Sequence, residues 1–211
     1  MPKIVNMSLL NTLLSTILQL LVFTFVPFLV YLLKHRQFKG FLGYIGIKRP
    51  NKKAVKFALI VFAILIPIAS VFYFSPDLRE ATSAENTVTG QLRMAGLSVS
   101  TLLQLFIIAI FKTALTEEIL FRGFIAKRLI DWLGFQWGNA IQSLVFGAIH
   151  LLIFIGQPFT VLLAAAVVFL PVIVGWITGY LNERSGNGSI VPGSILHALT
   201  NLVAYWALAF G

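Results

Sequence analysis

Two glutamates, Glu117 and Glu118, stand side by side in an otherwise apolar stretch, and His150 and His197 stand in two later apolar stretches. The whole chain holds only seven acidic residues and three histidines. An ionisable side chain within a membrane-spanning segment is costly to place there and by default marks a functional site. We therefore expect these four side chains to belong to a catalytic cavity within a membrane.

Spacing along a helix separates the two glutamates by role. Glu118 and Arg122 are four residues apart, so they share one helix face and can form an ion pair. Glu117 is rotated about 100° from Glu118 on a helix of 3.6 residues per turn. We therefore expect Glu117 to point elsewhere and to serve as a general base or acid.

Two further pairs of side chains have the same spacing of four residues. Phe146 and His150 form the first pair, and His197 and Asn201 form the second. An imidazole and a side-chain amide on one helix face could donate hydrogen bonds to the oxyanion of a tetrahedral intermediate. With a carboxylate and a second histidine to activate water, the set describes peptide-bond hydrolysis without a covalent intermediate.

In these motifs the chain resembles the intramembrane glutamic endopeptidases of the CAAX-protease and bacteriocin-processing (CPBP) family, also called the Abi or type 2 CAAX prenyl protease family. The family signature combines a Glu-Glu-x-x-x-Arg helix, a Phe-x-x-x-His helix and a His-x-x-x-Asn helix. All three motifs occur here in that order, within roughly the C-terminal half of the chain. Together they are specific, although each alone would be weak.

The resemblance implies a role for each motif residue. The implied catalytic residues are Glu117, His150, His197 and Asn201, and the implied supporting residues are Glu118, Arg122 and Phe146. In the family, the first glutamate and the Phe-x-x-x-His histidine activate the attacking water, and the His-x-x-x-Asn pair forms the oxyanion site. The resemblance also implies a metal-free site without a cofactor, and a peptide or membrane-associated protein as the substrate. Substrate identity, its prenylation and the oligomeric state stay open.

Composition indicates a membrane protein that spans the bilayer several times. Hydrophobic residues make up 58% of the chain and charged residues 11%, whereas soluble proteins average about 25% charged residues. The 211 residues allow about six spans of roughly 20 residues each. We therefore expect an all-α transmembrane helix bundle that forms a single membrane domain, 1–211. Residues 1–96 hold two spans and loops, and residues 97–211 are the motif-bearing protease core with a cavity open to the cytoplasm.

The charge of the chain is explained by membrane topology. The formal net charge is +9, and the loop 34–56 carries eight Lys and Arg residues and no acid. By the positive-inside rule this Lys-rich loop lies in the cytoplasm, so the basic balance predicts a multi-pass protein of the cell membrane in contact with lipid rather than nucleic acid. The absence of cysteine leaves carboxylate, imidazole, hydroxyl and amide groups for the chemistry.

The apolar stretches predict where the chain crosses the membrane. The expected spans are approximately 9–33, 57–74, 97–125, 138–155, 160–181 and 190–210. The expected connections are an external loop at 75–93, an interfacial turn or short amphipathic helix at 126–137, an external turn at 156–159 and a cytoplasmic loop at 182–189.

Depth within the bilayer tests whether the polar side chains could meet. At about 1.5 Å per residue from the cytoplasmic helix ends, Glu117 and His197 lie roughly 12 Å deep. By the same measure His150 and Asn201 lie roughly 18 Å deep. The span boundaries are placed only to within a few residues, so the two depths overlap. Residues from three helices can therefore line one cavity.

Simpler explanations exist for each motif taken alone. Glu117 and Glu118 could form a structural ion-pair network with Lys112 and Arg122, in which Lys112 is a counter-ion of Glu117, although Lys112 could instead extend toward the interface. Each histidine could serve a helix–helix hydrogen bond. Two histidines and a carboxylate could also bind zinc, but the H-E-x-x-H spacing is absent.

Two further functions use the same polar residues. A non-catalytic bacteriocin self-immunity protein or peptide-binding membrane protein would use the cavity as a binding site. A proton-linked transporter would also need buried acids, but the chain shows no inverted repeat.

Overall fold

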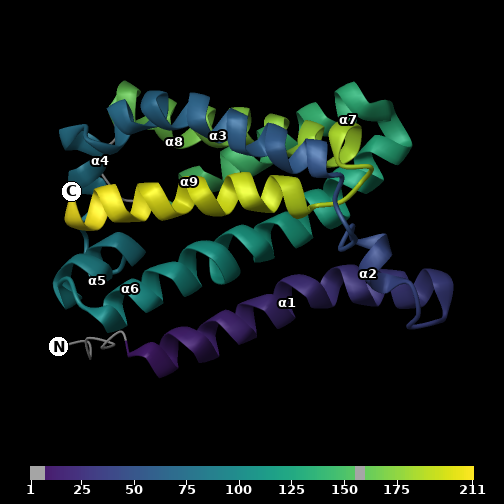
Figure 1. Ribbon diagram of the computed structural model, residues 1–211, viewed down its shortest axis with the longest axis horizontal. Coiled ribbons are helices and arrows are strands. Elements are labelled where there is room, and N and C mark those ends of the chain that lie inside the picture. The colour runs from purple at the N-terminus through teal and green to yellow at the C-terminus, as the bar shows by residue number, and fades with distance from the viewer. Residues whose placement is uncertain (1–7, 155–159) are drawn as a thin grey trace.

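The computed structural model describes residues 8–154 and 160–211, without the side chains at positions 153, 154, 162, 165 and 166. Within these ranges the chain forms helices and no strand (Figure 1), which confirms the all-α expectation. The α-helices are α1 (Leu9–His35), α2 (Phe41–Tyr44), α3 (Lys52–Tyr73), α4 (Pro76–Thr82), α5 (Val88–Ala95), α6 (Val99–Phe106), α7 (Lys127–His150), α8 (Val161–Tyr180) and α9 (Val191–Phe210). The wider π-helices are η1 (Ile107–Leu115), η2 (Glu118–Ala126) and η4 (Leu181–Ser185), and η3 (Leu151–Phe154) is a short 3₁₀ helix.

Helix α1 is polar where it is buried and apolar where it is exposed. The Ser8 hydroxyl caps its first turn, and its buried residues include Thr12, Thr16 and Tyr31. Its exposed residues are mainly leucine, valine, isoleucine and phenylalanine. A surface helix of a soluble protein has the reverse pattern. The outer face of α1 is therefore suited to lipid contact.

Among the described residues, four elements are long and apolar enough to cross a membrane: Leu9–His35, Lys52–Tyr73, Val99–His150 and Val191–Phe210. The third is 52 residues long and would extend about 78 Å at 1.5 Å per residue, more than twice the hydrocarbon core of about 30 Å. A kink at Gly134 (φ 76°, ψ 167°) divides it. This element therefore contains both the third and the fourth expected spans, and the total of about six spans stays a prediction.

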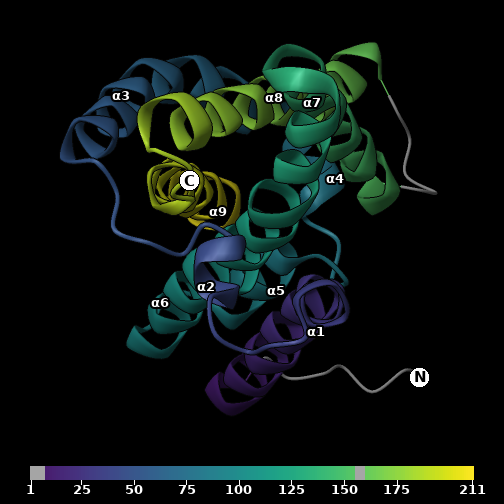
Figure 2. The ribbon, with the colours of Figure 1, turned by 90° about the vertical axis from the view of Figure 1, so that its right-hand side faces the viewer.

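Helix α9 lies in the middle of the bundle. Figure 1 shows α1 and the run from α6 to η2 on one side of α9, and α3 and α8 on the other, and the end view in Figure 2 agrees. Helix α9 packs against α3, α8 and η1, while α7 packs against α8 and η2. The two C-terminal motif residues therefore come from the central helix.

The expected external loop at 75–93 is largely helical, which corrects the sequence prediction. Ser75 caps α4 by accepting a hydrogen bond from Leu78 N at 3.4 Å, and Thr87 caps α5 by accepting one from Gly90 N at 3.0 Å. Serine or threonine at the N-cap and proline at the first helical position, here Pro76, both favour a helix start. Each helix is short, so the apolar periodicity that marks a long span is absent.

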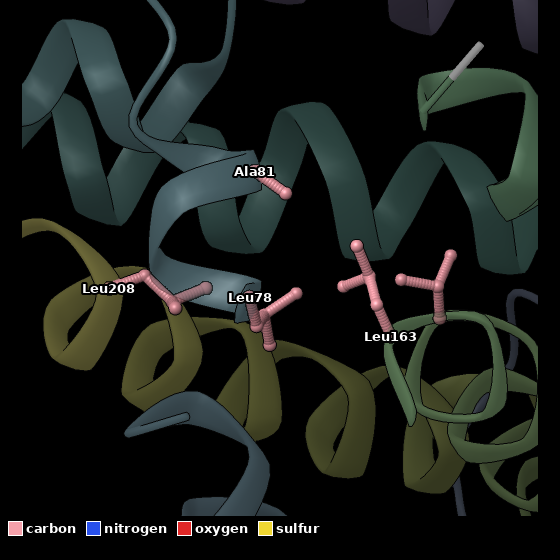
Figure 3. Packing of buried hydrophobic residues seen from close by; sticks show 5 residues of the cluster. Leu78, Ala81, Leu163 and Leu208 are labelled. Carbon is pink, nitrogen blue, oxygen red and sulfur yellow. The ribbon is translucent and has the colours of Figure 1, made fainter. Parts of the chain in front are cut away.

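A buried apolar cluster fixes α4 against the bundle. Leu78 and Ala81 of α4 pack with Leu163 and Val167 of α8 and with Leu208 of α9, and Figure 3 shows four of these side chains facing one another between the three elements. The helices between α3 and α6 therefore cover the end of the bundle where α1 begins and α9 ends (Figure 1).

The segment 126–137 is helical, in agreement with one of its two expected forms: it continues the helix of η2 into α7 and bends at Gly134, where the left-handed backbone favours glycine. One other connection differs from the expectation. The segment 182–189 begins as the π-helix η4, so the expected loop is partly helical. The expected turn at 156–159 lies outside the described residues.

Candidate active site

The glutamate motif lies in a helix with an irregular hydrogen-bond pattern. Two π-helices, η1 and η2, are separated by Thr116 and Glu117 alone. The Thr116 hydroxyl donates hydrogen bonds to the carbonyl oxygens of Lys112 and, at 3.0 Å, Thr113. Single-turn π-helical segments are rare and frequently occur at functional sites. The irregular segment here coincides with the residues that the sequence singled out.

Glu118 and Arg122 form the ion pair that their spacing predicts. Arg122 Nη1 lies 3.2 Å from Glu118 Oε1, and both side chains are buried, at 1% and 0% exposure. The Arg122 guanidinium carbon also lies 4.0 Å from the ring centre of Phe146. A Cβ on Gly175 would lie 3.1 Å from Arg122 Nη2, so the absence of a side chain on α8 leaves room for the guanidinium.

His197 connects the two glutamates. Its Nδ1 lies 3.2 Å from Glu118 Oε1, and its Nε2 lies 3.6 Å from Glu117 Oε2. A carboxylate only accepts hydrogen bonds, so the Nδ1 that faces Glu118 carries a proton. Nε2 can then donate a hydrogen bond only if the ring is protonated on both nitrogens.

The two glutamates occupy different environments, as the helical spacing predicts. The Glu117 side chain is 21% exposed, whereas that of Glu118 is completely buried. Within the part of the chain that the structure describes, Glu117 Oε2 is buried and has no hydrogen-bond partner. Glu117 therefore combines a partly exposed side chain with one buried oxygen that lacks a hydrogen-bond partner.

His150 is oriented by the backbone of its own helix. Its Nδ1 lies 2.7 Å from the carbonyl oxygen of Phe146, which can only accept, so Nδ1 carries the hydrogen and Nε2 is left with a lone pair. The Phe146 ring centre lies 4.8 Å from the His150 ring and 5.8 Å from the His197 ring. Phe146 therefore separates and positions the two imidazoles.

Asn201 lies one turn after His197 on α9. Its amide donates a long hydrogen bond of 3.5 Å to the carbonyl oxygen of Ala109 in η1. Among the described residues, the Asn201 side chain makes this hydrogen bond and makes none to Glu117 or His150. The structure therefore brings the glutamates, the histidines, Arg122 and Phe146 into one connected group, with Asn201 beside it.

Asn182 belongs to this group, although no motif in the sequence indicates that it does. Its Nδ2 donates to Glu118 Oε2 at 3.2 Å, and its Oδ1 accepts from Gly193 N at 2.8 Å. The residue is completely buried, although the sequence placed it in a polar loop. Asn182 is 64 residues from Glu118 in the sequence. The two residues are therefore not related by a helical spacing, and the sequence does not predict their contact.

A glycine at the start of α9 makes the Asn182 contact possible. A Cβ on Gly193 would lie 2.6 Å from Asn182 Nδ2 and 2.9 Å from Glu118 Oε2. Both distances are shorter than normal carbon contacts. Any larger residue at this position would push Asn182 away from Glu118.

Lys112 is held by α1. Its ammonium donates a hydrogen bond to Ser15 Oγ at 3.0 Å, and no ion pair joins it to Glu117 within the described ranges. The structure therefore disagrees with the interpretation of Lys112 as the counter-ion of Glu117. Within those ranges, the structure also contains no group of three His, Asp or Glu side chains arranged to hold a metal ion.

Comparison with known proteins identifies a family for the segment of the chain that carries these residues. A family model described as type II CAAX prenyl endopeptidase Rce1-like matches residues 99–203. The match includes α6 to α8 and most of α9, and so every residue of the group described above. No curated protein and no solved structure matches the chain.

Proposed function

From the premise that the chain belongs to the type II CAAX prenyl endopeptidase Rce1-like family, we propose how its buried polar group hydrolyses a peptide bond. Family membership makes the protein a membrane endopeptidase of the CAAX-protease type. The finer proposal is a metal-free glutamic endopeptidase whose substrate is a membrane-associated peptide or protein, cleaved near the cytoplasmic face. Its catalytic residues are Glu117, His150, His197 and Asn201.

One observation carries this proposal: Glu117 Oε2 is buried, lacks a hydrogen-bond partner among the described residues and faces His197 Nε2 at 3.6 Å. A buried carboxylate oxygen without a partner is costly. A water molecule at Oε2 would supply the missing hydrogen bond. The Glu117 carboxylate would then be close enough to this water to act as its general base.

In the first step, the Glu117 carboxylate takes a proton from this water. The lone pair on His150 Nε2 accepts a hydrogen bond from the water and orients it. The water oxygen attacks the carbonyl carbon of the peptide, and the carbonyl π electrons move to the carbonyl oxygen. A tetrahedral intermediate with one negatively charged oxygen results.

In the second step, the charged oxygen is stabilised by hydrogen bonds. In this step we assign His197 as the imidazolium: its Nδ1 donates to Glu118 at 3.2 Å, and its Nε2 donates to the charged oxygen. Asn201 has two amide hydrogens, and its long bond to Ala109 leaves one of them free for the oxyanion. Donors that are already oriented before the reaction typically contribute the largest part of such stabilisation.

In the final step, the intermediate collapses to products. The carbonyl bond forms again, the carbon–nitrogen bond breaks, and the leaving nitrogen takes the proton from Glu117. The products are a carboxylic acid and an amine, and Glu117 is again a carboxylate. Glu118 and Arg122 keep their charges throughout and hold His197 in place.

The same proposal assigns a topology. We place the Lys-rich loop 34–56 in the cytoplasm, and with it the open end of a cavity in a six-span protein of the cell membrane. The natural sequence has no cysteine, so a single Arg36→Cys variant gives an unambiguous signal. Labelling of this cysteine by a membrane-impermeant maleimide in intact cells would contradict the assignment.

The test of the catalytic proposal is cleavage by the purified protein in proteoliposomes. The probes are a peptide with a prenylated C-terminal CAAX sequence and the same peptide without the prenyl group, and mass spectrometry identifies the cleaved bond. We expect Glu117→Gln to reduce the rate by about 10²–10⁴-fold, because general acid–base catalysis is lost. Glu85→Gln, which changes an exposed glutamate, is the matched control and should cleave normally.

The outcomes separate the enzyme from a peptide-binding protein. If Glu117→Gln cleaves as fast as the natural protein, the glutamate mechanism is wrong. If Glu117→Gln does not cleave the peptide but restores a cellular processing or immunity phenotype, binding rather than hydrolysis is the biological role. Cleavage of the prenylated peptide alone would assign the substrate class.

A further inference from the structure

An open pocket of about 530 Å³ lies at the end of the bundle where α1 finishes and α7 begins. Its lining is basic and aromatic, with one acid. The lining residues are Lys34, His35, Tyr44, Arg128, Asp131 and Trp132. None of them belongs to the proposed catalytic group, and the volume falls within the range of small-molecule sites.

Arg128 is held in a fixed position within this pocket. Its guanidinium donates a hydrogen bond to the carbonyl oxygen of Gly123 at 3.1 Å and lies 3.5 Å from the ring centre of Tyr44. Such a contact between a cation and an aromatic face is favourable and leaves the positive charge in place. Within the described ranges, no carboxylate forms an ion pair with Arg128 or Lys34. The two cations are therefore available to an anionic ligand.

The length of α1 indicates that the pocket lies at the level of the membrane headgroups. Helix α1 has 27 residues and is about 40 Å long, close to the full thickness of a bilayer with its headgroup regions. Lys34 and His35 form its last turn, so they lie beyond the hydrocarbon core. Trp132 and Trp137 are 78% and 70% exposed, and tryptophan is enriched at this level.

We propose that this pocket binds the headgroup of an anionic phospholipid. Lys34 and Arg128 contact the phosphate, and the exposed face of Trp132 packs against the glycerol and the first acyl carbons. Asp131 accepts a hydrogen bond from a hydroxyl or ammonium group at the far end of the headgroup. The lining therefore matches a headgroup that has a net negative charge and carries a hydrogen-bond donor.

The experiment measures lipid retention by native mass spectrometry of the detergent-purified full chain. The probes are phosphatidylglycerol and phosphatidylcholine at equal concentration, and inorganic phosphate alone. The natural protein should retain phosphatidylglycerol in preference to phosphatidylcholine. Lys34→Gln should reduce that retention by at least about ten-fold, the loss expected when a specific hydrogen bond to a charged group is removed.

Lys53→Gln is the matched control because Lys53 is an exposed cation of the same basic segment outside the pocket. It removes the same charge and should leave retention unchanged. Equal losses in the two variants would show diffuse electrostatic attraction and overturn the proposal. Equal retention of both lipids would also overturn it, as would binding of inorganic phosphate without phosphatidylglycerol. Equal melting temperatures of both variants exclude an effect of unfolding.

Discussion

The helix formed by α6, η1 and η2 has two polar interfaces with different chemistry. Toward α1 the contacts are neutral groups and one lysine: Gln19 Nε2 donates to the Lys112 carbonyl oxygen at 2.8 Å, and Thr12 Oγ1 donates to Gln104 Oε1 at 3.3 Å. Toward α9 and η4 the contacts centre on the carboxylate of Glu118.

The two interfaces differ in how strongly their contacts fix the positions of the side chains. Hydrogen bonds between neutral groups of membrane helices contribute about 0.6 kcal/mol on average, which suffices to position a helix. A buried carboxylate requires a partner for each oxygen, and the removal of one partner leaves a buried charge without compensation, which is strongly destabilising. The α9 interface is therefore the one that holds its atoms in a single arrangement, as proton transfer requires.

The largest expected effect comes from breaking the charged interface at its centre. Glu118→Leu leaves Arg122 buried without a counter-ion, and such a change typically costs about 3–5 kcal/mol. Unfolding of the detergent-solubilised protein measures the loss. The double variant Glu118→Leu with Arg122→Leu removes both charges and should recover most of the stability. Equal stability of the single and double variants would mean that this ion pair contributes little.

An intermediate effect is expected at the edge of the charged interface. Asn182→Ala removes the hydrogen bonds to Glu118 and to Gly193 N, which should cost about 1–3 kcal/mol of stability. Because Glu118 holds His197, the maximal cleavage rate should also fall by about ten-fold, with little change in KM. Asn86→Ala, at an exposed position, is the control. A change in KM alone would assign Asn182 to substrate binding.

The smallest effect is expected at the neutral interface. Ser15→Ala removes the hydrogen bond from Lys112, so stability should decrease by about 0.6 kcal/mol and the cleavage rate should stay the same. Parallel unfolding and cleavage assays check both values. A loss of cleavage as large as that of Asn182→Ala would show that Lys112 acts on Glu117 after all.

The sequence predicted those regions of the molecule that depend on local periodicity. The all-α fold and the Glu118–Arg122 pair follow from hydropathy and from spacing along one helix, and the structure confirms both. The unequal environments of Glu117 and Glu118 follow from the same geometry. The catalytic roles of Glu117, His150, His197 and Asn201 stay predictions, because they depend on a substrate.

The features that the sequence did not predict depend on contacts between distant segments. Asn182 reaches Glu118 across 64 residues, and the contact exists because Gly193 lacks a side chain. Helices α4 and α5 are too short to show periodicity, and they are held by caps and by packing against α8 and α9. The π-helical turns near Glu117 arise from a shifted backbone register that composition does not encode.

The central position of α9 also has a consequence for biosynthesis. The proposed site is supplied in chain order by η2, α7, η4 and α9, so a nascent chain that has reached only Tyr180 carries Glu117 without His197 or Asn182. Glu118 then has Arg122 as its partner, and the two proposed oxyanion donors, His197 and Asn201, are not yet synthesised. If the proposed mechanism is right, the ribosome-bound intermediate is inactive, and cleavage requires that α9 first packs between the helices that precede it in the chain.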